Sequence, residues 1–224
     1  MNLSRAAWLR SLPFAVFMGL LALRGWAPTD LSWGFDTRWL YALNLLLVGG
    51  LMACYWRDYG ELNWQNWPGL SELLLAVALG LAVFGLWITL TAPWMQIGQG
   101  TASFVPVDAQ GRLDWPLIAV RWLGAALLVP VMEELFWRSF LMRWFDQLQF
   151  ESVAPQHVSL KAVLMSTFVF TLAHPQWLAA VVAGLAYAWL YRRQGRLWTA
   201  VIAHAVTNGV LGAWVVATGR WAFW

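Results

Sequence analysis

The chain has 224 residues, of which 61% are hydrophobic and 11% are charged, and its formal net charge is +3. Soluble domains carry about 25% charged residues, so this composition excludes an ordinary soluble domain and indicates an integral membrane protein. The single cysteine, Cys54, excludes an intrachain disulfide and a cysteine-based metal site. The basic residues are not interleaved with aromatic residues as in a nucleic-acid-binding surface, so we expect no nucleic-acid partner.

Apolar segments recur along the chain with the length of membrane-spanning helices, which need about 20 apolar residues each. In chain order they cover residues 11–27, 38–56, 69–92, 117–142, 160–175, 176–191 and 197–218. They predict an all-α fold: a polytopic membrane helix bundle with about seven to eight transmembrane helices, forming a single domain over residues 1–224. An eighth span would lie in the ends of these segments or in the connection 93–116.

The positions of the basic residues predict how the chain is oriented. Cytoplasmic ends of membrane spans carry an excess of Arg and Lys. With a cytoplasmic N-terminus, nine of the 14 Arg and Lys residues fall on the cytoplasmic side and five on the opposite side. This distribution favours a cytoplasmic N-terminus.

The fourth predicted span contains two adjacent acidic residues, Glu133 and Glu134, with long apolar stretches on both sides. An ionised side chain at the centre of a bilayer costs at least about 2.5–3.5 kcal/mol. Glu134 and Arg138 are four residues apart on one helix face and are expected to pair. Glu133 points about 100° away from that face and lacks this partner. We therefore expect a chemical role for one glutamate and a structural role for the other.

Two of the three histidines lie at apolar spans. His174 ends the fifth span, four residues after Phe170 and directly before a proline that disfavours further helix. His204 lies in the seventh span, four residues before Asn208 and on the same helix face. A carboxylate, two imidazoles and an amide on three different helices are the parts of a hydrolytic site.

At these residues the chain resembles the CPBP family of glutamic-type intramembrane proteases, the group that contains the Rce1-like CAAX prenyl endopeptidases. The family's three motifs are E-E-x-x-x-R, F-x-x-x-H and H-x-x-x-N/D, and here they read E-E-L-F-W-R, F-T-L-A-H and H-A-V-T-N. The resemblance covers a catalytic half of about residues 117–217. The length and tryptophan content also resemble CAAX-protease-related proteins of bacterial exosortase or PEP-CTERM sorting systems, which implies a bacterial inner membrane.

The resemblance implies an intramembrane endopeptidase that hydrolyses a peptide bond of a membrane-associated protein substrate with an activated water. The residues implied as catalytic are Glu133, His174, His204 and Asn208, and those implied as supporting are Glu134, Arg138 and Phe170. No cofactor is expected, and the sequence leaves the oligomeric state open. In the orientation given above, we expect these side chains to surround a water-filled cavity that opens mainly to the cytoplasm.

Other functions would use the same residues. Glu133, His174 and His204 could form a two-histidine, one-carboxylate zinc site of an intramembrane metalloprotease, although the chain lacks the H-E-x-x-H spacing. A non-catalytic membrane partner or immunity protein would use the polar cluster only to hold helices together. A proton-coupled transporter would use the carboxylates, but the chain has no evident internal repeat.

Overall fold

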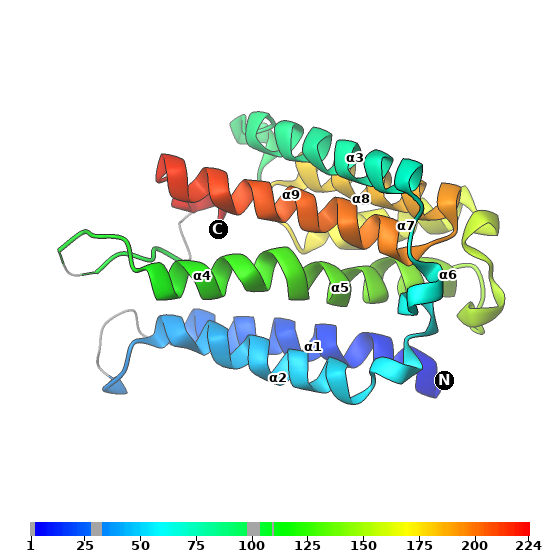
Figure 1. Cartoon of the computed structure of the whole chain (residues 1–224), viewed down its shortest axis with the longest axis horizontal. Coiled ribbons are helices and arrows are strands. Elements are labelled where there is room, and N and C mark those ends of the chain that lie inside the picture. Colours follow the sequence, from blue (N-terminus) through cyan, green and yellow to red (C-terminus); the bar gives the residue numbers. More distant parts are fainter. Residues whose placement is uncertain (1–2, 28–32, 98–103, 109) are drawn as a thin grey trace.

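The computed structural model describes residues 3–27, 33–97, 104–108 and 110–224. Its long helices run roughly along one axis, and the N-terminus and the C-terminus lie toward opposite ends of that axis (Figure 1). We call these the N-terminal end and the C-terminal end of the bundle. The predicted all-α fold is confirmed, because the only β feature within the described residues is an isolated bridge between Val107 and Leu113.

Within the part of the chain that the structure describes, nine α-helices build the bundle. In chain order they are α1 (Arg5–Trp26), α2 (Leu40–Cys54), α3 (Leu70–Thr89), α4 (Trp115–Leu123), α5 (Val129–Glu134), α6 (Met142–Trp144), α7 (Leu160–Leu172), α8 (Trp177–Gln194) and α9 (Leu197–Thr218). Two π-helical segments, η7 (Gly124–Leu128) and η8 (Leu135–Leu141), join α4, α5 and α6 into one rod. The connections contain short 3-10 helices: η2 (Thr37–Trp39), η3 (Trp56–Asp58), η4 (Gly60–Leu62), η5 (Trp64–Asn66), η6 (Pro93–Met95), η9 (Phe150–Ser152), η10 (Pro155–His157) and η11 (Trp221–Phe223).

Each of the seven predicted spans corresponds to a helix or to a helical rod. Five are long and apolar enough to cross a membrane by length and composition, and they cover Arg5–Trp26, Thr37–Cys54, Leu70–Thr89, Trp115–Trp144 and Leu197–Thr218. Helix α7 is apolar but has only 13 residues, and α8 is not among these five. In the connection 93–116 the described residues form η6 and the isolated bridge, while residues 98–103 and 109 lie outside the described part.

The first helix starts earlier than predicted, at Arg5 instead of residue 11. Ser4 caps it by accepting a hydrogen bond from the backbone N–H of Ala7 at 3.2 Å. Inside the helix, Arg10 is buried and pairs with Glu61 across 2.6 Å, between Nη2 and Oε2. The hydropathy pattern did not predict these first residues as helical, because the charge of Arg10 is compensated by Glu61, which lies far along the chain.

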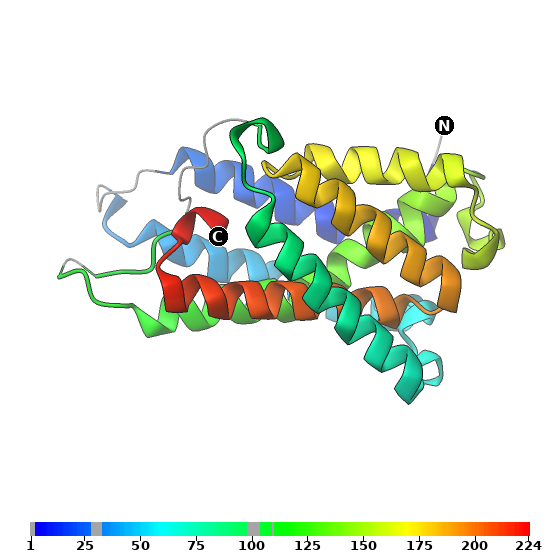
Figure 2. The same ribbon diagram turned by 90° about the horizontal axis from the view of Figure 1, so that it is seen from above.

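Helix α9 packs against α3, α8 and the rod formed by α4 and α5. Figure 2 shows α3 crossing α9 at an angle. A Cβ atom on Gly80 of α3 would lie 2.4 Å from the carbonyl oxygen of Ala203, so the close crossing depends on glycine. Gly184 of α8 allows a similarly close approach of α7, because a Cβ atom added to it would lie 2.8 Å from Cγ2 of Thr167. These contacts fix α9, which carries His204, relative to its neighbours.

Candidate active site

A buried ion cluster joins three helical segments. The predicted pair between Glu134 and Arg138 is present, with Nε and Oε2 3.2 Å apart. The other carboxylate oxygen of Glu134 lies 2.9 Å from Nδ1 of His204. Arg138 also donates to the carbonyl oxygen of Gly184 at 3.3 Å. Because Glu134 is 0% exposed and Arg138 is 2% exposed, each charge depends on the other for compensation.

The contact between Glu134 and His204 was not predicted from the sequence, which placed His204 with Asn208 only. In a neutral imidazole, Nδ1–H donates to the carboxylate and Nε2 is left as the second polar atom. A carboxylate behind a histidine fixes the orientation of its ring. Glu134, which pairs with the buried Arg138, therefore also orients the ring of His204.

Aromatic rings surround the cluster. The guanidinium of Arg138 lies 4.7 Å from the ring centroid of Phe170 and 5.4 Å from that of Tyr187. The ring of Tyr187 also stacks on His204 with centroids 5.1 Å apart, and its hydroxyl donates to Thr207 at 2.8 Å. Cation–π contacts of this kind contribute about 2 kcal/mol when desolvated. The sequence analysis missed Tyr187, although a tyrosine in an apolar span signals a buried hydroxyl that needs a partner.

His174 follows the end of α7, where Pro175 was predicted to stop the helix. Its Nδ1 lies 2.8 Å from the carbonyl oxygen of Phe170, one helical turn earlier. When Nδ1–H donates to this oxygen, Nε2 of the neutral ring is left as an acceptor. The ring packs at 4.4 Å from that of Phe170 and edge-on to that of Trp87 at 5.8 Å. The F-x-x-x-H motif therefore orients one imidazole.

Asn208 contacts the backbone of the rod near Pro130. Its Nδ2 donates to the carbonyl oxygen of Ala125 at 2.9 Å. Ala125 lies in the π-helical segment η7, where backbone hydrogen bonds run to the fifth residue along the chain. The fifth residue after Ala125 is Pro130, which has no N–H. Asn208 supplies the missing donor and keeps a second N–H for other partners.

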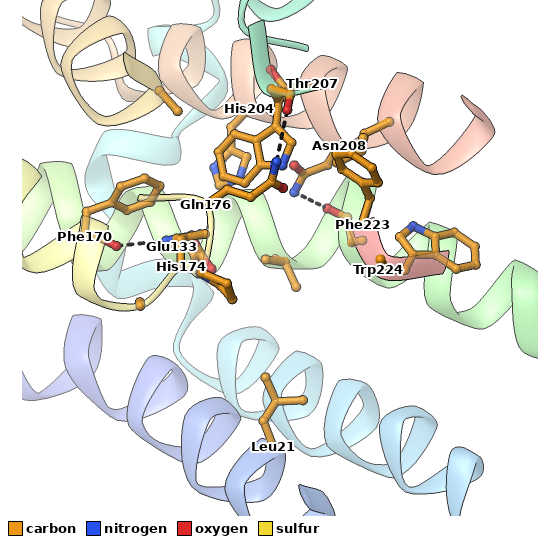
Figure 3. Close-up of a pocket in the computed structure, with 18 of the residues that line it drawn as sticks. Leu21, Glu133, Phe170, His174, Gln176, His204, Thr207, Asn208, Phe223 and Trp224 are labelled. Atoms are coloured by element: carbon orange, nitrogen blue, oxygen red, sulfur yellow. Dashed lines mark hydrogen bonds between the residues drawn. The ribbon is translucent and has the colours of Figure 1, made fainter. Parts of the chain in front are cut away.

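The structure brings the four residues implied as catalytic to one cavity of about 700 Å³, lined by Glu133, His174, His204 and Asn208 (Figure 3). Glu133 is 9% exposed, and its Oε2 is buried without a hydrogen-bond partner. His174 interacts electrostatically with both Glu133 and His204. Glu134 does not line the cavity. The two adjacent glutamates thus have different surroundings, as their positions on the helix predicted.

The direction of the cavity differs from the expectation. Its lining includes Thr91, Gln96, Arg121 and Arg220, which belong to segments at the C-terminal end of the bundle. On the other side of Glu133, the ion cluster and its aromatic rings fill the space between the helices. With a cytoplasmic N-terminus, the cavity therefore extends toward the exported side and not toward the cytoplasm, which corrects our prediction.

The acidic and imidazole side chains do not form a metal-binding group. Within the described residues, no three His, Cys, Asp or Glu side chains are close enough together to hold one ion. This arrangement does not fit the zinc site considered from the sequence.

Part of the chain that forms this site also matches a known protein family. Residues 115–210 match the family described as Type II CAAX prenyl endopeptidase Rce1-like. Over this segment, 96 of the 224 residues, the chain is similar to the Rce1-like endopeptidases. No curated protein and no solved structure matches the chain.

All three motifs lie within the matched segment, which extends from the first residue of α4 into α9. The Rce1-like family is a family of proteases, and the helices suited to a membrane make the chain an integral membrane protein. Helices α1, α2 and α3 lie outside the matched segment, yet α1 supplies one wall of the cavity through Phe14, Phe17, Met18 and Leu21.

Proposed function

We propose that this chain is a glutamic-type intramembrane endopeptidase that cleaves a membrane-associated protein substrate inside this cavity. The observation that carries the proposal is the convergence of Glu133, His174, His204 and Asn208 on one cavity, all four within the segment that matches the Rce1-like family. These residues come from three distant parts of the chain. In a cluster that served only to hold helices together we would expect paired carboxylates, whereas Glu133 lines the cavity and has a carboxylate oxygen without a hydrogen-bond partner.

In the proposed mechanism, Glu133 takes a proton from a water molecule as the water oxygen bonds to the carbonyl carbon of the scissile peptide. Nε2 of His174 accepts the second hydrogen of this water and holds it in place. His204 and the free N–H of Asn208 stabilise the oxyanion, and the carboxylate of Glu134 fixes the orientation of the His204 ring. The proton held by Glu133 then passes to the amine nitrogen as the C–N bond breaks.

The test compares wild type with Glu133→Gln, His174→Ala and His204→Ala in cells. Loss of general base catalysis lowers rates by about 10²- to 10⁴-fold. We expect each variant to accumulate an uncleaved membrane protein that proteomics of membrane and secreted fractions detects. The matched controls are Glu151→Gln and His157→Ala, which change the same residue types at exposed positions. Variants that fold, insert and still process this protein at the wild-type rate would refute the proposal.

We further propose a bacterial inner membrane and a cytoplasmic N-terminus. The excess of Arg and Lys on the N-terminal side supports this orientation. The cavity then receives substrate from the exported side. Fusions of a reporter that is active only in the periplasm test this: fusion after Thr218 should be active, and activity of a fusion before Arg5 would reverse the orientation.

A further inference from the structure

The side chain of Tyr187 in α8 contacts the site, although it belongs to none of the three motifs. Its ring stacks on the imidazole of His204, with centroids 5.1 Å apart and an angle of 19° between the planes. Tyr187 is 1% exposed, and it lines the cavity together with His204. The guanidinium of Arg138 lies 5.4 Å from the centroid of the same ring. The proposed mechanism uses no atom of Tyr187.

The hydroxyl of Tyr187 is anchored to α9. It lies 2.8 Å from the hydroxyl oxygen of Thr207, which lies 2.9 Å from the carbonyl oxygen of Gly80 and 3.0 Å from that of Ala203. A carbonyl oxygen only accepts, so the single hydrogen of the Thr207 hydroxyl is donated to these oxygens. The oxygen of Thr207 therefore accepts from Tyr187. Because this bond uses the hydrogen of the Tyr187 hydroxyl, that hydrogen is not available to a substrate.

The orientation of His204 needs more than one contact. Its Nδ1 lies 2.9 Å from the carboxylate of Glu134, which fixes one edge of the ring. The ring can still turn about this contact, and such a turn moves Nε2, the nitrogen that faces the oxyanion in the proposed mechanism. Stacking on Tyr187 opposes the turn because it fixes the plane of the imidazole. The two contacts together determine the direction of Nε2.

We infer that Tyr187 is a positioning residue whose ring, held in place by Thr207, keeps the imidazole of His204 aimed at the scissile carbonyl. This inference rests on the proposed function. The anchor and the imidazole project from the same helix, α9, three residues apart (Figure 3). The carbonyl oxygen of Gly80 ties the anchor to α3, which lies outside the segment that matches the Rce1-like family. Side chains and backbone of α3, α8 and α9 thus act on one imidazole.

The first experiment separates the ring from the hydroxyl. The full chain in detergent micelles is incubated with a library of ten-residue apolar peptides that carry a fluorophore and a quencher, and kcat and KM are measured for the peptide cleaved fastest. Tyr187→Leu should lower kcat by about 10- to 10²-fold, the cost of misplacing a catalytic group by about 1 Å, and should leave KM within about 2-fold. Tyr187→Phe retains the ring and should keep kcat within about 5-fold of wild type.

Tyr191→Leu is the matched control. Tyr191 lies one turn later in α8, is 2% exposed and does not line the cavity. This change also removes a buried tyrosine from the same helix, so it should lower stability without changing kcat per folded molecule. Equal losses of kcat in Tyr187→Leu and Tyr191→Leu would show that the packing of α8, and not the stacked ring, affects the reaction, and would overturn the inference.

A double-mutant cycle tests the anchor. Tyr187→Phe and Thr207→Val each remove the hydrogen bond between the two hydroxyls. Because the second change has no bond left to break, the double variant should lose less kcat than the product of the two single losses. Losses that multiply would show that the two hydroxyls act separately, and would overturn the anchoring of Tyr187 by Thr207.

An NMR measurement tests the position of the ring without cleavage. The full chain is labelled with ¹³C-histidine, and the signals of His204 are assigned by their loss in His204→Ala. The ring current of a stacked tyrosine should place the ring-proton signals of His204 upfield of those of the exposed His157. Tyr187→Leu should remove this displacement, and Tyr187→Phe should retain it. Signals of His204 that do not move in Tyr187→Leu would overturn the inference.

The wild-type spectrum gives the same decision if Tyr187→Leu does not fold, because His204 signals at the position of His157 would show that the two rings are not stacked. Absence of peptide cleavage by wild type would count against the proposed function instead. In that case the NMR result still decides whether Tyr187 holds the imidazole.

Discussion

Two buried ion clusters in this molecule resemble each other in composition but differ in what surrounds them. In one, Glu134 is held by Arg138 and His204 beside the cavity. In the other, at the N-terminal end, Glu61 is held by Arg10 and accepts a hydrogen bond from the hydroxyl of Ser139. Both compensate a carboxylate with an arginine from a helix.

The cluster around Glu61 ties the connection between α2 and α3 to α1 and to the rod, and its residues do not line the cavity that contains Glu133. The cluster around Glu134 also holds helices together. In the same helix, however, the adjacent residue Glu133 lines the cavity. Comparing the two clusters distinguishes charges that are paired and hold helices together from charges that have no partner within the chain. Glu133 has no salt-bridge partner among the described residues and lines the cavity, and this is the carboxylate to which we assign the chemistry.

The largest effect on stability should come from Glu134→Gln. This change leaves Arg138 fully buried without a carboxylate, and breaking a buried pair costs about 3–5 kcal/mol. Unfolding of the purified chain by SDS in mixed micelles, followed by tryptophan fluorescence, measures the loss. Glu133→Gln serves as the control and should unfold within about 0.5 kcal/mol of wild type, because Glu133 has no charged partner. Equal destabilisation by the two changes would remove the distinction between the adjacent acids.

A smaller effect is expected at the other cluster. Glu61→Gln should cost about 2 kcal/mol, the contribution of hydrogen bonds to a charged group, without changing cleavage per folded molecule. Burial opposes ionisation of Glu61, but the hydrogen bonds and charge of Arg10 outweigh it and hold the pKa of this carboxyl below its usual value.

This pKa gives the prediction a pH dependence. Because the folded state lowers the pKa, the stabilisation is complete above the unfolded value of about 4.3 and is lost as the pH falls through the folded value. The difference between wild type and Glu61→Gln should therefore shrink below about pH 4. A difference that stays constant down to acidic pH would show that packing, and not charge, stabilises this cluster.

The helix crossing that positions His204 gives an effect of similar or smaller size. Gly80→Ala places a Cβ against the backbone of α9 and should destabilise the chain by about 1–3 kcal/mol while lowering cleavage. Gly85→Ala is the matched control in the same helix, since its Cβ would meet no atom within 4 Å. If both variants behave alike, the crossing of α3 and α9 is not what places His204.

Metal chelators are expected to leave the rate of cleavage unchanged. The described residues lack a group that could hold a metal ion, so cleavage should proceed at the same rate in 1,10-phenanthroline. Activity that disappears in the chelator and returns with zinc would support the metalloprotease alternative.

The sequence by itself determined the helical membrane architecture, because runs of apolar residues of sufficient length have few other stable states in a bilayer. It also singled out Glu133, Glu134, His174 and His204. Placing polar groups in apolar spans costs free energy, so their presence there indicates a function or a compensating partner. The pairing of Glu134 with Arg138 followed from helix geometry alone.

Tertiary structure decided the contacts between segments. Which glutamate meets His204 depends on how α9 crosses the rod, and a spacing within one helix contains no information about that crossing. The start of α1 depended on Glu61, which lies far along the chain from Arg10. Arg121 lines the cavity, although no motif in the sequence singled it out. Its place on the wall of the cavity arises because the π-helical turn at η7 shifts the phase of the helix, and helical periodicity does not predict that shift.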